Sequence, residues 1–295
     1  MNELILGTAM VYDVRLERGV HDYYALFGER EWARLENPSD GQVEFAITRA
    51  VLAQHLQPGA RVLDLGGGPG RYTIWLAGQG HRVTLGDLSI DLLNLARTHV
   101  RESSVEDKVE AILELDARDL SVFPESCFDA VVCLGPFYHL PDPADRARSA
   151  SELSRVLRPG GVAFVGLMPR LALLRRTMAL VDERHHLLQA SFVEQLLVDG
   201  GFFNDVPGRF THGYGARPEE VGPFFDQMGF DMLALLSTES ITLGLQDALP
   251  DLLADESLAA AVLSLAIKYA ADPSTLGFAY HLLYVGRRRA DAKGV

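Results

Sequence analysis

The feature that most constrains the fold of this chain is a regular alternation of strand-like and helix-like segments that begins at residue 61. Short apolar runs predict strands over residues 61–65, 81–86, 109–115, 128–134 and 162–167. Segments with helical spacing separate most of them, over residues 70–78, 89–101 and 143–157. Strands that alternate with helices pair in parallel through right-handed crossovers. The pattern therefore predicts a Rossmann-like α/β fold with a mostly parallel sheet.

The same pattern divides the chain into four predicted parts. Residues 1–57 are expected to form an N-terminal helical lid, and residues 58–168 the core. The alternation stops over residues 169–217, which we interpret as a cap insertion. Residues 218–295 return to the sheet, with a helix over 218–228, strands over 230–236 and 277–286, and a helical insertion over 250–271. With these strands the predicted sheet has seven members.

Composition limits the classes of function open to the chain. Its 295 residues are 48% hydrophobic, which is enough for a large core. A net charge of −13 without a basic face argues against nucleic-acid partners. Few cysteines, no signal-peptide pattern and no apolar run long enough to span a bilayer favour a cytoplasmic protein without membrane contact. A small-molecule partner fits these properties better.

A glycine-rich run that starts at Asp64 lies between the first predicted strand and the helix after it. Its glycines Gly66, Gly68 and Gly70 let the backbone turn tightly and approach a ligand closely. A dinucleotide-binding loop would place its third glycine at position 71, where this chain has Arg71. The loop therefore suits a nucleoside ligand that has no pyrophosphate.

Two later strand ends add polar groups at the same edge of the predicted sheet. Asp87, followed by Leu88, ends the second strand roughly 20 residues beyond the first glycine, where a carboxylate can accept both ribose hydroxyls. Asp116 and Ala117 follow the third strand, where a carboxylate can accept the adenine amino group and a backbone N–H can donate to the ring. Three successive strand ends therefore predict an adenosine site at the carboxyl edge of the sheet.

These segments resemble the motifs of the class I S-adenosylmethionine-dependent methyltransferases. The glycine run, Asp87, the pair Asp116–Ala117, the strand at 128–132 and the turn at 157–161 match that family in order and spacing. The resemblance implies S-adenosylmethionine as cofactor and in-line transfer of its methyl group. The protein would then align a nucleophile with the methyl–sulfur bond and exclude water.

Within that family the chain resembles bacterial small-molecule enzymes of natural-product type, some of which methylate indole rings. The segment 134–140 is similar to the one such enzymes place beside the transferred methyl, which assigns Leu134 to the cofactor. Tyr23, Tyr24 and the segment 31–35 look like their helical lid. This implies a catalytic role for Tyr23 and cofactor contacts for Tyr24 and Arg34.

His139 is the candidate general base. It follows the fourth predicted strand at the edge where ligands bind, and an unperturbed imidazole titrates near neutral pH. A base is needed only if the nucleophile carries a proton that must leave. The alternative interpretation is that His139 only borders the substrate.

The remaining polar signals are weaker. His185, His186 and His212 have no second ligand cluster at suitable spacing, so no metal is expected. Glu239 and His281 lie near late strands and could reach a pocket, but we interpret them as ordinary strand-end polar residues.

The sequence leaves the acceptor open, since carbon, nitrogen or oxygen can be methylated on this fold. A homodimer that exchanges N-terminal segments is one further expectation. The alternatives to a small-molecule enzyme are a methyltransferase acting on a protein or RNA side group, and a non-catalytic cofactor-binding module.

Overall fold

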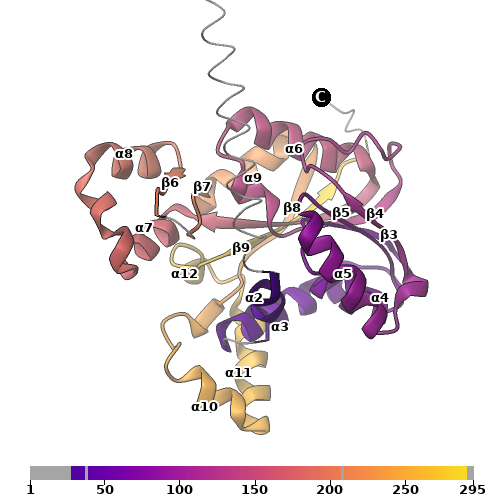
Figure 1. The fold of residues 1–295 in the computed structure, drawn as a ribbon, viewed down its shortest axis with the longest axis horizontal. Helices are drawn as coiled ribbons and strands as arrows, with labels where there is room; N and C mark the ends of the chain where they lie inside the picture. Colours follow the sequence, from indigo (N-terminus) through magenta and orange to yellow (C-terminus); the bar gives the residue numbers. More distant parts are fainter. Residues whose placement is uncertain (1–27, 37–38, 207–208, 291–295) are drawn as a thin grey trace, which may run out of the picture.

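The computed structural model describes residues 28–36, 39–206 and 209–290, and every element named here lies within them. Of the nine strands in this part of the chain, seven build a central sheet in the order β3-β2-β1-β4-β5-β9-β8 (Figure 1). Strand β9 is antiparallel to both neighbours, and the other pairs of the core are parallel. The bounds are β1 Arg61–Leu65, β2 Arg82–Asp87, β3 Val109–Glu114, β4 Phe128–Cys133, β5 Leu157–Pro169, β8 Phe230–Ser237 and β9 Leu282–Arg288. The predicted Rossmann-like α/β fold is confirmed.

Helices cover both faces of this sheet (Figure 1). Helices α6 (Pro143–Val156) and α9 (Pro218–Gln227) bury their apolar sides on one face. Helices α3 (Ser39–His55), α4 (Arg71–Gly78), α5 (Ile90–Glu102) and α11 (Glu256–Tyr269) cover the other. Strand β4 is buried on both sides, since Val131 packs into one core and Val132 into the other. This double burial explains why that strand is apolar almost throughout.

The C-terminal helical insertion differs from the prediction. Residues 250–271 were expected to form one helix, but they form two, α10 (Leu249–Ala254) and α11. The break lies at Asp255, whose extended backbone lets its side chain accept the backbone N–H of Leu258 at 2.8 Å. An aspartate at this position caps a new helix more favourably than it continues the previous one. Both helices pack against α3.

Residues 170–216 form a lobe beside the carboxyl end of β5 (Figure 1). It contains α7 (Arg170–Ala179), the 3₁₀ helix η3 (Val181–Leu188), α8 (Ala190–Val198) and the hairpin β6 (Gly201–Phe203) and β7 (His212–Ala216). A small core of its own holds it together, with Leu173, Phe192 and Phe202 buried. Strand β7 continues the sheet by pairing in parallel with the last residues of β5.

The last strand of the sheet is shorter than predicted. It begins at Leu282 rather than at residue 277, so the residues before Leu282 lie outside the strand. Among the described residues, no helix combines the length and the apolar character that crossing a bilayer requires.

Candidate functional site

The glycine-rich loop joins β1 to α4 at the carboxyl edge of the sheet. Gly66, Gly68 and Gly70 have φ of 70°, 53° and 90°, in the left-handed region that disfavours side chains. A Cβ on Gly66 would also lie 2.3 Å from Cδ of Pro136. The loop therefore keeps its shape only with glycine at these positions, and it turns backbone rather than side chains toward a ligand.

Asp64 supports this loop from inside the protein. Its side chain is buried, and its Oδ2 accepts a hydrogen bond from Thr73 Oγ1 at 2.6 Å. A Cβ on Gly67 would lie 2.7 Å from the same oxygen, so the carboxylate lies directly under the loop. Burial raises the pKa of Asp64 to about 6. Asp64 is thus placed to support the loop from inside the protein, and a direct contact of Asp64 with the cofactor stays a prediction.

Asp87 joins the glycine loop to the start of α5. Its Oδ2 accepts from the backbone N–H of Gly68 at 2.9 Å, and its Oδ1 from that of Ser89 at 2.8 Å. Burial raises the pKa of Asp87. Each carboxylate oxygen keeps a second lone pair, which leaves it able to accept ribose hydroxyls. The neighbouring Leu88 is exposed.

Asp116 is already paired within the protein. Arg118 donates to it from its backbone N at 2.8 Å and from its Nη2 at 2.6 Å, and Nη1 of Arg118 reaches Asp145 at 3.1 Å. Ala117 is buried. An adenine amino group at Asp116 would therefore share the carboxylate with Arg118, which the sequence alone did not suggest.

Helix α2 (Gly28–Ala33) lies against α5, close to the glycine loop. Trp32 stacks on the His99 ring with centroids 3.7 Å apart, and the Arg71 guanidinium lies 3.4 Å from the Trp32 ring. Arg71 also donates to the Trp32 carbonyl at 2.8 Å. Arg71, the residue that replaces a dinucleotide-binding glycine, thus fastens the N-terminal segment to the loop. The predicted lid residues Tyr23 and Tyr24 lie outside the described residues.

A pocket opens at the carboxyl ends of β4 and β5, beneath α3. Leu134 and Tyr138 enter it from the segment after β4, and Arg34 and Glu44 enter from the N-terminal side. The full lining is Arg34, Glu44, Thr48, Leu134, Tyr138, Gly166, Thr238, His281, Leu282 and Leu283. The predicted site residues Arg34 and Leu134 therefore lie in one pocket, although they are far apart in sequence.

Charged groups in this pocket form a chain that sequence analysis missed. Nη1 of Arg34 donates to Glu44 at 2.9 Å, and Nδ1 of His281 lies 3.6 Å from Glu44 and 3.5 Å from Glu239. Glu239 is buried and accepts the backbone N–H of Tyr280 at 2.9 Å. The structure thus favours the alternative that His281 and Glu239 reach a pocket over their interpretation as ordinary strand-end residues. No local pattern could reveal this, because α3, β8 and β9 meet only in the tertiary structure.

The pKa values in this chain follow from burial and opposing charges. Burial by itself disfavours the imidazolium of His281, but its hydrogen bond to Glu239 and the charges of Glu44 and Glu239 outweigh this, so its pKa is raised. Burial by itself would raise the pKa of Glu44, yet Arg34 and His281 lower it. The two carboxylates beside His281 therefore favour its protonated form, as a group that accepts a proton requires.

His139 has a different environment from the one expected of a base. Its ring packs against Phe210 and Tyr138, each with centroids 4.9 Å away. Burial lowers the pKa of His139 to about 4. It is also absent from the pocket lining, whereas its neighbour Tyr138 is part of it. These features favour the alternative in which His139 shapes the site.

Within the described residues, two groups have metal-ligand geometry. One is Glu44, Glu239 and His281, and the other is His185, His186 and Asp205 in the lobe of residues 170–216. His212, which the sequence analysis considered together with the two lobe histidines, instead packs edge-on against Phe203 with centroids 4.7 Å apart. The prediction of no metal overlooked Asp205, which approaches the histidine pair only through folding.

Comparisons with known proteins agree with this description. Residues 62–161 match the model of a methyltransferase domain family. The ubiquinone biosynthesis O-methyltransferase of Xanthomonas campestris pv. campestris is 38% identical over 122 residues, which cover 41% of this chain and 48% of that protein. The enzyme of that name from Xylella fastidiosa is 34% identical over 178 residues, 59% of this chain and 62% of that protein. The chain thus spans about half to two thirds of the length of these relatives.

Solved structures share the fold at low sequence identity. A S-adenosylmethionine-dependent methyltransferase from Methanosarcina mazei superposes with a TM-score of 0.56 at 18% identity, covering 82% of this chain and 98% of that one. The 1,6-didemethyltoxoflavin-N1-methyltransferase of Burkholderia thailandensis, solved with its acceptor and S-adenosylhomocysteine, gives 0.51 at 17% identity over 91% of this chain and 90% of that one. A cyclase gives 0.50 at 19% identity, covering 83% of this chain and 80% of that one, so the fold alone does not define the reaction.

Proposed function

Because residues 62–161 form a class I S-adenosylmethionine-dependent methyltransferase domain, we propose that the whole chain transfers a methyl group to a small-molecule acceptor. The observation that carries this proposal is the pocket beside Leu134, which lies at the same carboxyl edge of the sheet as the glycine loop, because β4 pairs in parallel with β1. It combines an apolar wall with a few convergent charged groups, as small-molecule sites do. The net charge of −13 argues against RNA as the acceptor.

The cofactor would be held by backbone and carboxylate groups. The glycine loop presents its main chain where a nucleoside can approach closely, and Asp87 offers free lone pairs to ribose hydroxyls. S-adenosylmethionine would supply a methyl group already activated on a sulfonium. The chain's own residues then have to orient the acceptor, exclude water and remove a proton where one must leave.

We assign proton removal to His281, in place of His139. Its Nδ1 faces Glu44 and Glu239, so its Nε2 is the nitrogen left to accept a proton from a substrate. His281 lines the pocket with 29% of its side chain exposed. The two carboxylates would stabilise the imidazolium that forms, much as a carboxylate orients and stabilises a catalytic histidine elsewhere. Arg34 holds Glu44 in place from the far side.

A base in this pocket favours an acceptor that loses a proton. We propose a hydroxylated aromatic molecule, methylated on oxygen, because its hydroxyl would meet His281 and its ring would meet Leu134 and Tyr138. The names of the curated relatives, which are O-methyltransferases of ubiquinone biosynthesis, support this class. A ring nitrogen that carries a proton is the second candidate, supported by the pocket chemistry and by the N1-methyltransferase of similar fold.

The test starts with the cofactor and proceeds to the acceptor. Calorimetric titration should give S-adenosylhomocysteine a micromolar Kd, about −8 kcal/mol. Isotope-labelled S-adenosylmethionine, incubated with a panel of phenols, quinols and N–H heterocycles, should then transfer label to at least one of them. Binding without transfer to any phenol, quinol or N–H heterocycle would instead support a non-catalytic module.

His281→Gln isolates the proposed base, and His55→Gln, on the far end of α3, is its matched control. The first variant should lower kcat about 10²–10⁴-fold and remove the rise of kcat with pH, while the second should leave both unchanged. A fall confined to acceptor KM in His281→Gln would refute proton removal by this residue.

A further inference from the structure

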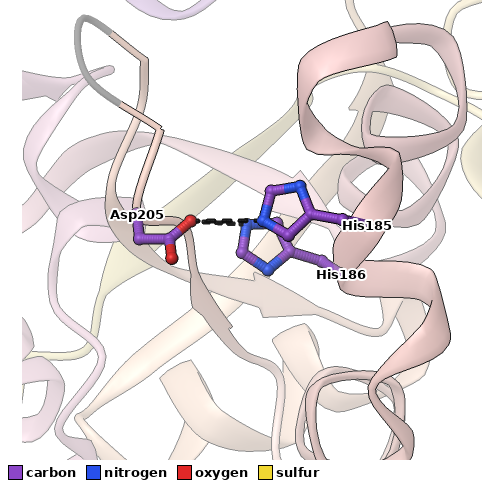
Figure 2. Close-up of side chains that lie close together, drawn as sticks. All are labelled: His185, His186 and Asp205. Atoms are coloured by element: carbon purple, nitrogen blue, oxygen red, sulfur yellow. Dashed lines mark hydrogen bonds and ion pairs between the residues drawn. The ribbon is translucent and has the colours of Figure 1, made fainter.

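We infer that His185, His186 and Asp205 bind a zinc-type divalent cation in the lobe of residues 170–216. Nε2 of His185 and Nε2 of His186 lie 3.4 and 3.3 Å from the same oxygen, Oδ1 of Asp205 (Figure 2). Neighbouring residues of a 3₁₀ helix normally point about 120° apart. Here the two rings instead lie with centroids 4.0 Å apart and turn toward one carboxylate.

The hydrogen bonds of His185 leave a lone pair facing that carboxylate. Its Nδ1 lies 3.0 Å from the carbonyl oxygen of Asp182, an acceptor, so the ring proton belongs on Nδ1. Neutral His185 then presents an unprotonated Nε2 to an unprotonated carboxylate oxygen. The lone pairs of these two atoms, 3.4 Å apart, repel one another unless a positive charge lies between them. Either a second proton on His185 or a metal ion would supply that charge. A carbonyl that receives Nδ1–H is also the usual outer partner of a metal-bound histidine.

His186 is positioned more rigidly, and its proton is the one that a metal would displace. It is buried and stacked on Phe192 with centroids 5.2 Å apart. Without a metal, its Nε2 donates to Oδ1 of Asn204 at 3.1 Å. Metal binding at Nε2 would move this proton to Nδ1 of the same ring.

The spacing and the chemistry of the three groups match a zinc-type ion. Bonds of about 2.0–2.1 Å to a tetrahedral centre place two ligand atoms about 3.3–3.4 Å apart, as found for both His–Asp pairs. Two imidazoles and one carboxylate suit Zn²⁺ or Co²⁺ better than Mg²⁺ or Ca²⁺, which prefer oxygen. His185 and Asp205 are exposed, which leaves the remaining coordination position to water. Within the described part of the chain, Asp205 forms its ion pairs with these two imidazoles.

The second group with metal-ligand geometry is a poorer candidate. Glu44 is paired with the guanidinium of Arg34 at 2.9 Å, which places a fixed positive charge beside any cation. Both oxygens of Glu239 accept backbone N–H groups of residues 280 and 281. These contacts favour the proton chemistry assigned above over metal binding.

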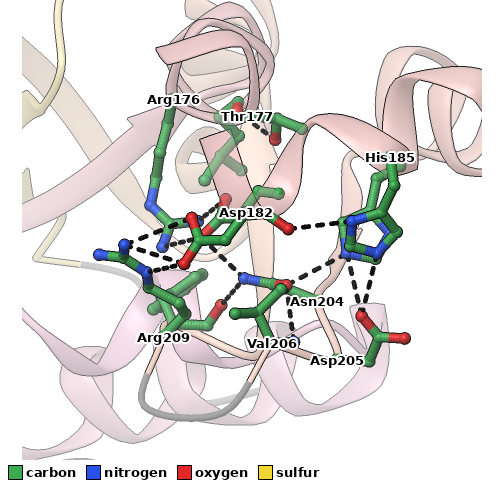
Figure 3. Close-up of polar contacts among 12 residues, drawn as sticks. Arg176, Thr177, Asp182, His185, Asn204, Asp205, Val206 and Arg209 are labelled. Atoms are coloured by element: carbon green, nitrogen blue, oxygen red, sulfur yellow. Dashed lines mark hydrogen bonds and ion pairs between the residues drawn. The ribbon is translucent and has the colours of Figure 1, made fainter. Parts of the chain in front are cut away.

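A polar network holds the lobe cluster in place (Figure 3). Glu183 accepts from Arg176 at 2.8 Å and from Nδ2 of Asn204 at 2.9 Å, which fixes the residue next to Asp205. The backbone carbonyl of Asp182 accepts from Nδ1 of His185, and the carboxylate of Asp182 forms an ion pair with Arg209 at 3.0 Å. The strand end and the 3₁₀ helix are therefore joined on both sides of the cluster, so little rearrangement is needed to bind an ion.

The same network extends to Phe210 and, through its ring, to His139. Nδ2 of Asn204 also donates to the carbonyl of Phe210 at 3.1 Å, and the Phe210 ring packs against His139. An ion at Asp205 would thus fix the segment that carries Phe210. Its binding can be measured without any methyl-transfer assay, so the inference stands apart from the proposed function.

The experiment uses the untagged full chain after removal of metal with a chelator. Calorimetry with ZnCl₂ should give one ion per chain, and MgCl₂ should give no binding. Co²⁺ should produce the strong visible absorption of a four-coordinate site. His185→Gln and Asp205→Asn should each weaken Zn²⁺ binding at least tenfold, whereas the matched controls His55→Gln and Asp199→Asn should bind as the parent does.

Circular dichroism keeps the test valid if a variant folds poorly. Zn²⁺ should raise the melting temperature of the parent and of Asp199→Asn, but not that of folded Asp205→Asn. Equal Zn²⁺ binding in parent and Asp205→Asn would overturn the proposal, as would no Zn²⁺ binding at all.

Discussion

Gly66→Ala is the sharpest test of the glycine loop, because the structure separates its two costs. Gly66 has φ of 70°, a conformation that costs an L-residue about 1–2 kcal/mol. A Cβ there would in addition lie 2.3 Å from Cδ of Pro136, in a closely packed turn. Forcing extra carbon into such a site costs about 1–3 kcal/mol more. Together these terms predict a loss of about 2–5 kcal/mol in the free energy of unfolding.

Gly59→Ala provides the matched control. Gly59 has nearly the same φ, 69°, but a Cβ there would meet no atom within 4 Å. It should therefore lose only the conformational cost of about 1–2 kcal/mol. Gly59 also lies at the opposite end of β1 from the glycine loop, so its replacement should leave cofactor affinity unchanged.

Denaturant unfolding and calorimetry with S-adenosylhomocysteine measure the two effects separately. Gly66→Ala should unfold with a larger loss than Gly59→Ala, and its affinity for S-adenosylhomocysteine should fall at least tenfold, which is about 1.4 kcal/mol. The reasoning fails if the two variants lose the same stability, since the Pro136 contact would then be irrelevant. It also fails if a folded Gly66→Ala binds S-adenosylhomocysteine as the parent does.

Three further changes probe the site. Asp87→Ala should remove hydrogen bonds to ribose worth about 1.5–3 kcal/mol each and so weaken S-adenosylhomocysteine at least tenfold in calorimetry; unchanged affinity in a folded variant would place the ribose elsewhere. Asp64, whose pKa burial raises from 3.8 to about 6, keeps its proton in the folded state after the unfolded chain has lost it, so stability should fall by about 3 kcal/mol as pH rises from about 4 to 6. Asp64→Asn should flatten that part of the pH–stability curve, and an unaltered curve would contradict the assignment. His139→Ala should raise acceptor KM without changing the pH dependence of kcat, because burial lowers the pKa of His139 to about 4; a lost pH dependence would return the role of base to it.

Local sequence patterns determined the sheet and the cofactor side of the site. The strands around Asp64, Asp87 and Asp116 are short apolar runs with a turn or polar residue at their ends, so their place at one sheet edge follows from parallel pairing alone. The glycines of the loop report a backbone conformation that only they adopt readily, and this information is also local. The presence of Arg71 argued against a dinucleotide-binding loop, but the contact of Arg71 with Trp32 was visible only in the structure.

The acceptor side and the lobe were decided by tertiary structure. Glu44 is separated from Glu239 and His281 by most of the chain. The three meet because β9 pairs antiparallel with both β8 and β5 while α3 packs over that edge. Asp205 reaches His185 and His186 because the hairpin of β6 and β7 folds back against η3. Sequence periodicity reports which face of an element is buried, whereas contacts between distant polar side chains depend on how the elements pack. For that reason the sequence by itself predicted the fold and a nucleoside site, whereas only the folded chain shows the polar clusters on which the proposed base and the proposed metal site rest.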